Sequence, residues 1–335
     1  RGRLAEDIRQ RDQGPHFLLG QRARLLTCGG VDIPVLRPPG PEAVALLAAE
    51  RCGRLHARGF AARPAGFTFV LVGDLPPDEE LGRLLGRHLG ALHGGQTDSW
   101  LSAGTFVPSA LPADFATGVV RETIFSSTAE KATVLLIFRA CVPVEDAGRA
   151  HVEALVEVQV SCRCAENRLL ESMRREAGGV YSVSVGFGRT SLSPHGLITI
   201  SFECDASQHD ALTARALEQL LQLQQDGLSA EEASGVASAL ADTHARNMAG
   251  PAASSYWMFY LLDAYKAERL RRAKEACGSA VEPASPDAHA VEDDARAASR
   301  CRADLIAAAA TPERLRSAFG RHFQLDNYVH LVLQP

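Results

Sequence analysis

The stretch NRLLESMRREAGGVYSVSVGFGRTSLSPHGLITISFEC, residues 167–204, indicates the fold of the chain more clearly than any other. Its first part continues a helix that we expect to stop at the glycine pair 178–179, because glycine commonly ends helices. The strand that follows places alternate residues on one face: Tyr181, Val183, Val185 and Phe187. A second strand over 197–202 returns beside it. The stretch therefore predicts a helix, a tight turn and a β-hairpin in direct succession.

The segments on either side supply the rest of a sheet and its covering helices. Runs rich in Val, Ile and Thr are typical of strands, and apolar residues at helical spacing predict helices. We expect strands at 117–125, 132–138 and 328–333, and helices at 145–176, 207–226, 254–276 and 311–323. Ser229 and Glu232 form a capping-box pattern at the start of one more helix. Hairpins with segregated helices predict the α+β class, an antiparallel sheet with helices packed on one face.

The first third of the chain shows weaker patterns. A boundary rich in proline and glycine at 38–41 precedes a predicted helix over 42–56. The nearly all-apolar run 67–72 is typical of a strand covered on both faces. Acidic residues after Pro77 open a further helix. The polar segment 93–114 is expected to be a linker.

Length and composition limit the kinds of protein that the chain can be. At 335 residues it suits about two domains of roughly 150 residues each, and a hydrophobic content of 46% is ample for a core. The spread formal charge of −5 argues against nucleic-acid or anionic-membrane partners. No apolar run reaches about 18 residues, so no membrane span is expected.

The acidic segment 278–294 is expected to be a mobile surface loop. The chain starts at Arg1 without Met or a signal-peptide pattern, so we expect a fragment, a processed product or a partial chain.

Familiar catalytic motifs are absent from the sequence. The eleven histidines form neither H-E-x-x-H nor H-x-x-E-H, the spacings that bring two histidines onto one helix face for zinc, so no metal site of this type is expected. Nucleophile elbows, P-loops and dinucleotide fingerprints are absent as well. The G-x-G at 186–188 is interpreted as a bulge or a close backbone approach, with phosphate binding as the alternative. Eight scattered cysteines are interpreted as buried or free thiols rather than disulfide partners or metal ligands.

One polar pair near the predicted turn could carry chemistry. Arg174 lies in the last helical turn before the double glycine, and Tyr181 lies at the start of the next strand. The turn can bring both side chains to one edge, where an arginine could bind a carbonyl or carboxylate and a phenol could donate to an oxyanion. The alternative is structural: Arg174 complements the helix C-terminus and Tyr181 packs.

Three segments resemble a known family in both content and order. FTFVLVGDLPPDEELGRLLGRHLGAL (67–92) resembles a family strand and helix, MRREAGGVYSVSV (173–185) resembles its L-R-E-x-x-G-x-x-Y-S-V element, and LDNYVHLVLQP (325–335) is similar to its closing strand. The family is that of the pitrilysin/insulinase-type zinc metallopeptidases, the inverzincins, with mitochondrial processing peptidase and the core proteins of the respiratory bc1 complex. The resemblance implies a metallopeptidase-half fold. It also implies that residues 1–41 are the tail of a preceding α+β domain and that 42–335 are the C-terminal peptidase-type domain.

The resemblance also implies that two halves with different roles close around a peptide. The N-terminal half carries H-x-x-E-H, and this chain lacks it, so Zn²⁺ would be held by a missing N-terminal half or a partner subunit. The C-terminal half contributes an arginine and a tyrosine that bind the peptide substrate. Matched motif to motif, these are Arg174 and Tyr181. Arg175 departs from the family pattern, which usually has glutamate there. The chain alone is expected to catalyse nothing.

Two functions follow from this resemblance. The first is the substrate-binding, non-catalytic half of a zinc metalloendopeptidase that degrades or processes peptides. The peptide substrate would be held partly by strand addition to a sheet edge. The alternative is a catalytically inactive structural or assembly subunit, similar to the bc1 core proteins. The resemblance points to an organelle, a mitochondrion or plastid, or otherwise to another soluble intracellular location.

Overall fold

The computed structural model describes residues 2–29, 38–60, 69–90, 115–142, 149–177, 180, 182–189, 196–275 and 288–335. The chain divides into two compact units. The sheet unit comprises Arg1–Val44, Ala110–Ala241 and Arg302–Pro335, and the helical unit comprises Ala45–Ser109 and Asp242–Cys301. Both units are discontinuous in sequence, and each is described by itself.

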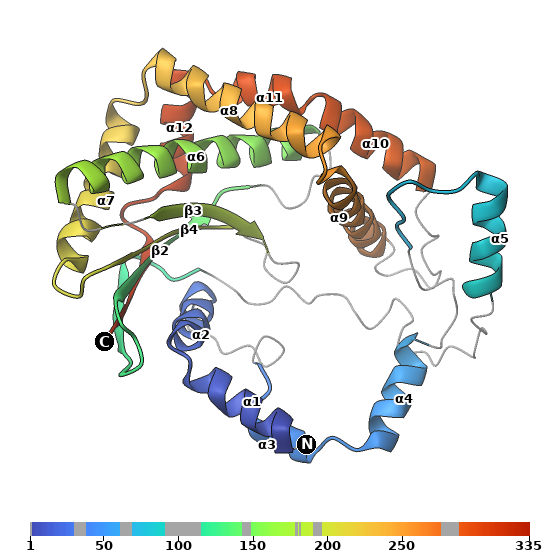
Figure 1. Ribbon diagram of the computed structural model, residues 1–335. Coiled ribbons are helices and arrows are strands. Elements are labelled where there is room, and N and C mark those ends of the chain that lie inside the picture. Colours follow the sequence, from blue (N-terminus) through green and yellow to red (C-terminus); the bar gives the residue numbers. More distant parts are fainter. Residues whose placement is uncertain are drawn as a thin grey trace. The chain divides into compact units, whose positions relative to one another are not determined.

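A five-stranded sheet forms the centre of the sheet unit (Figure 1). Its strands lie in the order β1 (Val120–Phe125), β5 (Tyr328–Gln334), β2 (Ala132–Ala140), β4 (Gly196–Cys204) and β3 (Val183–Arg189). All neighbouring pairs are antiparallel except β1 with β5, which is parallel. The predicted hairpin is present as β3 and β4, with Val183 opposite Phe202.

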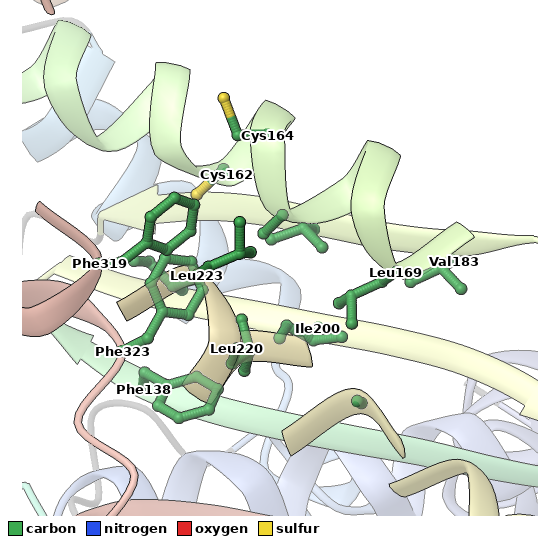
Figure 2. Packing of buried hydrophobic residues seen from close by; sticks show 14 of the residues in the cluster. Phe138, Cys162, Cys164, Leu169, Val183, Ile200, Leu220, Leu223, Phe319 and Phe323 are labelled. Atoms are coloured by element: carbon green, nitrogen blue, oxygen red, sulfur yellow. The ribbon is translucent and has the colours of Figure 1, made fainter. Parts of the chain in front are cut away.

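One face of this sheet is covered by helices. The sequence predicted α6 (Arg149–Ala177), α7 (His209–Gln225) and α12 (Pro312–His322), but it did not predict α11 (Arg302–Ala309). Helix α6 packs against β3, α7, α11 and α12, and Figure 1 shows it running along the strands. The buried side chains between these layers form one continuous core. Figure 2 shows Phe138, Phe319 and Phe323 gathered in it, and the ring centroids of Phe138 and Phe323 are 5.5 Å apart.

The opposite face of the sheet carries a second, smaller core. Helix α2 (Pro15–Thr27), which follows α1 (Gly2–Gln13), packs Leu19 with Ile137 of β2 and Leu331 of β5. This contact explains why β2 and β5 are buried almost continuously instead of alternating, as strands covered on both faces are. The α+β class is confirmed, and the packing of α2 and the parallel pairing of β1 are details that the sequence patterns did not indicate.

The helical unit contains α4 (Ala49–Phe60), α5 (Asp78–His88), α9 (Ala253–Glu275) and α10 (Ala288–Arg300), together with residues 242–249 of α8 (Ala230–Ala249). Its described core includes a small polar cluster. His244 bonds through Nε2 to the carbonyl of Ser299 at 3.0 Å, and the hydroxyl of Tyr256 lies 3.4 Å from His244 Nδ1. These bonds connect α8, α9 and α10.

Several local predictions are wrong in the structure. The helix expected over 42–56 is divided into α3 (Pro41–Ala45) and α4, with exposed Leu46 and Leu47 between them. Residues 69–72 form no strand. The loop expected over 278–294 is helical from Ala288 onward. Residues 67–68, 93–114 and 278–287 lie outside the described residues. The domain boundary at 41/42 stays a prediction, although the first 44 residues belong to the sheet unit by their contacts.

Candidate functional site

The end of α6 and the start of β3 form the corner to which the sequence assigned the candidate residues. Arg174 lies three residues before the end of α6 and its side chain is exposed. Tyr181 lies outside the described residues, as does the glycine pair before it. Val180 and Val183, on either side of Tyr181, are both buried in the main core. The chain is therefore anchored immediately before and two residues after Tyr181, and the proximity of Arg174 to Tyr181 stays a prediction.

Strand β3 is an edge strand of the sheet, because within the described residues it pairs with β4 alone. The side chains of Val183, Val185 and Phe187 face α6 and the main core. The alternate residues Ser184 and Gly186 are exposed on the other face. An edge strand presents backbone donors and acceptors that a further extended chain can use.

Strand β3 is regular, and the two glycines within it have open space around their Cβ positions. The pairing with β4 is one to one from Val183 to Arg189, so the predicted bulge at 186–188 is absent. A Cβ atom built on Gly186 or Gly188 would meet no atom within 4 Å. The described residues therefore do not make the predicted close backbone approach at these glycines.

A carboxylate from α6 reaches the unpaired side of β3. The backbone N–H of Val185 donates to Glu166 Oε1, with 3.4 Å between nitrogen and oxygen. Glu166 also forms an ion pair with Arg163 on the same helix, and its side chain keeps 21% of its exposure. The sequence predictions did not include Glu166. A signal was present, because Glu166 interrupts the apolar stripe of Cys162, Leu169 and Met173, where an apolar residue is expected on a buried helix face.

An ion pair and a hydrogen bond connect the C-terminal half of α6 to neighbouring helices. Arg168 binds Glu232, at the start of α8, at 2.7 Å, and Arg215 of α7 donates to Ser172 Oγ at 2.8 Å. Burial acts to raise the pKa of Glu232, but hydrogen bonds from Ser229 and the charge of Arg168 outweigh it, so the pKa lies below its ordinary value. These contacts fix α6 against α7 and α8.

The described residues do not fit a resident metal. In the parts of the chain that the structure describes, no three His, Cys, Asp or Glu side chains lie together in a way that could hold a metal ion. The seven described cysteines form no disulfide with one another. Burial raises the pKa of Cys162 and Cys164 to about 12 and that of Cys204 to about 11, so these thiols stay protonated and unreactive at neutral pH. No helix in the described ranges has the length and hydropathy needed to cross a membrane.

The described residues define a mixed α+β domain with an open sheet, of which β3 is one edge strand, and they contain no cluster of metal ligands. Residues 62–240 match the family described as the peptidase M16 inactive domain, so the chain belongs to that family. The resemblance to the pitrilysin/insulinase-type metallopeptidases is thereby confirmed.

Similar proteins agree with this assignment. A "Zinc protease PQQL-like" protein of Arabidopsis thaliana is 25% identical over 273 residues, which are 78% of this chain and 27% of that protein. The periplasmic protease PqqL of Escherichia coli superposes with a TM-score of 0.67 at 18% identity, over 100% of this chain and 32% of that one. The ferredoxin protease FusC, solved with Arabidopsis ferredoxin, gives a TM-score of 0.60 at 15% identity, over 97% of this chain and 30% of that one. The chain thus spans about a quarter to a third of these relatives.

Proposed function

We propose that this chain is the substrate-binding, non-catalytic part of a zinc metalloendopeptidase that degrades or processes peptides. The observation that carries the proposal is the match to the inactive domain of a peptidase family, together with the edge position of β3 among the described residues, beside the predicted Arg174 and Tyr181 corner. An extended peptide would add to this edge through its backbone, a general mode of peptide capture.

Arg174 and Tyr181 would bind the peptide where it leaves the strand edge. The exposed guanidinium of Arg174 carries donors in a planar fork and would bind a backbone carbonyl of the peptide. The phenol of Tyr181 would donate a hydrogen bond to the carbonyl oxygen at which negative charge develops. Val180 and Val183, which precede and follow Tyr181 in the sequence, are both buried.

In this proposal the zinc ion is bound outside this chain. Because the described residues do not fit a metal, Zn²⁺ would be held by an N-terminal half or a partner subunit. Ferredoxin accompanies one structural neighbour, which supports a polypeptide as the class of substrate. One neighbour is named as periplasmic, and the organellar location that the resemblance implies for this chain stays a prediction.

A cleavage assay of the full-length protein tests the proposal. Chelator-sensitive turnover of a fluorogenic peptide is expected, with kcat/KM about 100-fold lower in Tyr181→Phe, the order of effect for losing one oxyanion donor. Arg174→Ala is expected to lower kcat/KM as well. Arg316→Ala, which removes an exposed arginine of α12, serves as the control and should leave kcat/KM unchanged.

Two results would contradict different parts of the proposal. Unchanged turnover in both Arg174→Ala and Tyr181→Phe would show that the two residues are not the binding pair. Absence of chelator-sensitive turnover in the full-length protein with its partners would contradict the peptidase function and favour the structural subunit.

A further inference from the structure

The carboxylate of Glu166 occupies a position on β3 that a peptide carbonyl would need. A backbone N–H in a strand points either toward the neighbouring strand or away from it, within the plane of the sheet. Because the N–H of Val185 donates to a side chain of α6, it points away from β4, toward the unpaired side. Glu166 therefore caps a donor of the open edge.

The same geometry identifies the other backbone groups of β3 that face away from β4. In an antiparallel pair, residues whose N–H and C=O face outward alternate with residues bonded to the neighbour. Val183 and Phe187 are two residues before and after Val185, so their backbone groups also point outward. We call the outward groups of Val183, Val185 and Phe187 the β3 edge. Its middle donor is the one that Glu166 caps.

We propose that Glu166 is an edge-protecting residue that an extended peptide must displace to bind. The inference rests on the proposed peptide-binding function and adds a residue that regulates it. The carboxylate oxygen stands where the carbonyl oxygen of an added strand would accept from Val185. An uncapped edge can pair with any extended chain, including another copy, and a charged side chain placed over it prevents such pairing.

The structure supports displacement as well as protection. At 3.4 Å the bond from Val185 to Glu166 is long compared with ordinary N–H···O bonds of 2.7 to 3.2 Å, so it is weak. Glu166 is partly exposed and keeps Arg163 as its ion-pair partner, so the released carboxylate has both water and a cation available. Gly186 and Gly188 carry no side chain, and a Cβ atom at either would meet no described atom within 4 Å, so the sheet face at these two positions is open next to an incoming strand.

The occupant that fits is an extended backbone with free amide groups. The edge offers alternating N–H and C=O groups at strand spacing, which a peptide in β conformation matches along its whole length. A ligand without that repeat could satisfy only one position. The probe for the experiment is therefore a fluorescein-labelled decapeptide of alternating Thr and Val with a lysine at each end. Its control is the same peptide with alternate amides N-methylated, which removes the donors needed for strand pairing.

The experiment compares Glu166→Ala, Glu166→Gln and Glu171→Ala in the full-length protein. Glu171 is an exposed acid on the same helix and serves as the matched control. Glu166→Ala should bind the unmodified decapeptide about 3- to 10-fold more tightly than wild type, the range for losing one competing hydrogen bond. The affinity of Glu166→Gln for the decapeptide should lie between those of wild type and Glu166→Ala, because the glutamine amide oxygen still accepts a hydrogen bond but carries no charge. Glu171→Ala should match wild type, and the N-methylated peptide should bind none of the proteins.

Amide hydrogen exchange without peptide gives an independent measurement. The Val185 amide should exchange faster in Glu166→Ala than in wild type, while the amides of Val183 and Phe187 stay unchanged. Equal peptide affinity and equal Val185 exchange in wild type and Glu166→Ala would overturn the role of Glu166 while leaving peptide binding intact. Absence of decapeptide binding by every variant would instead overturn peptide capture at β3, and the role of Glu166 with it.

Discussion

Glu157 connects two helices of the sheet unit, α6 and α12, through its side chain. Its Oε1 lies 2.5 Å from Arg321 Nη2 and 3.2 Å from His322 Nε2, both at the end of α12. The N–H of Cys141 donates to His322 Nδ1 at 3.3 Å, so in the neutral ring Nε2 carries the proton and donates to Glu157. Burial acts to raise the pKa of Glu157, but the hydrogen bonds from His322 and Arg321 outweigh it, so the pKa lies below its ordinary value.

Removing this charge should destabilise the folded chain in a pH-dependent way. Glu157→Gln is expected to lower the free energy of unfolding by about 1–2 kcal/mol at pH 7, because a charge-assisted bond is replaced by a neutral one. A pKa that is lower in the folded state stabilises that state above the ordinary value of about 4.3. The difference between variant and wild type should therefore shrink as the pH falls through the folded pKa. Urea unfolding of both proteins at a series of pH values from neutral to acid measures this difference in stability.

An exposed ion pair provides the control for this variant. Glu218 binds Arg215 at 2.7 Å on α7, with 52% of its side chain exposed. Surface pairs of this kind contribute about 0–1 kcal/mol, so Glu218→Gln should change stability little. A Glu157→Gln effect that stayed constant from pH 7 down to strongly acidic pH would show that the charge of Glu157 is not the cause.

The sequence could predict some candidate residues and not others, for a physical reason. Arg174 and Tyr181 flank a double glycine at a spacing that depends only on neighbours along the chain, so a motif could indicate them. Glu166 and Glu157 act on partners 19 and 164 residues away, Val185 and Arg321. No local spacing encodes such pairs.

At the scale of elements, the start of α8 is the clearest agreement between sequence and structure. The predicted capping box is present: Ser229 Oγ accepts from the N–H of Glu232 at 3.1 Å, and Glu232 Oε2 accepts from the N–H of Ser229 at 2.9 Å. Two donors at the helix start are thereby satisfied. Arg168 binds the same glutamate, so the cap also connects α8 to α6.

Loss of the cap should destabilise the chain measurably. Ser229→Ala is expected to lower the free energy of unfolding by about 1 kcal/mol, the usual cost of losing an N-cap hydroxyl. Ser238→Ala, at an exposed position inside the same helix, should be neutral or slightly stabilising, because alanine favours helix interiors. Thermal or urea unfolding of both variants distinguishes the cap from a general effect of losing a serine. Equal changes in the two variants would contradict the capping role.

The elements that sequence patterns misjudged lack strong local signals. The start of α10 reads as an acidic, weakly apolar loop, yet Val291, Ala295 and Ser299 recur every four residues and are buried on one helix face. Small residues give this stripe little hydrophobicity, so it becomes visible only when the partner helix α9 is present. The hairpin of β3 and β4, by contrast, has large apolar residues at strand spacing and was predicted correctly.

At the scale of the whole molecule, the last strand of the chain is a central strand of the sheet. Strand β5 lies between β1 and β2 and pairs with both. Its buried residues contribute to the cores on both faces of the sheet: Tyr328 and Val332 to one, Val329, Leu331 and Leu333 to the other. The sheet unit therefore depends on residues at the far end of the sequence.

Truncation at the two ends should have very different effects. Deleting residues 328–335 should prevent the sheet unit from folding, because five buried side chains at about 1.5–3 kcal/mol each rival a typical total stability of about 5–15 kcal/mol. Deleting residues 1–7, which are mostly exposed, should leave a cooperative unfolding transition with a small loss of stability. Near-ultraviolet circular dichroism and limited proteolysis measure both. A native spectrum after loss of β5 would contradict the central position of this strand.

The sequence by itself determined the α+β class, the hairpin after α6, the cap of α8, the absence of the H-x-x-E-H motif and the family resemblance. Each of these depends on residue types at short spacing, where helix and strand periodicity and capping chemistry act. Only the tertiary structure decided the order of the strands, the parallel pairing of β1 with β5, the second core under α2 and the placement of Glu166 over Val185. These depend on which buried surfaces and polar groups meet across the fold, and side chains far apart in sequence find one another only when the core closes.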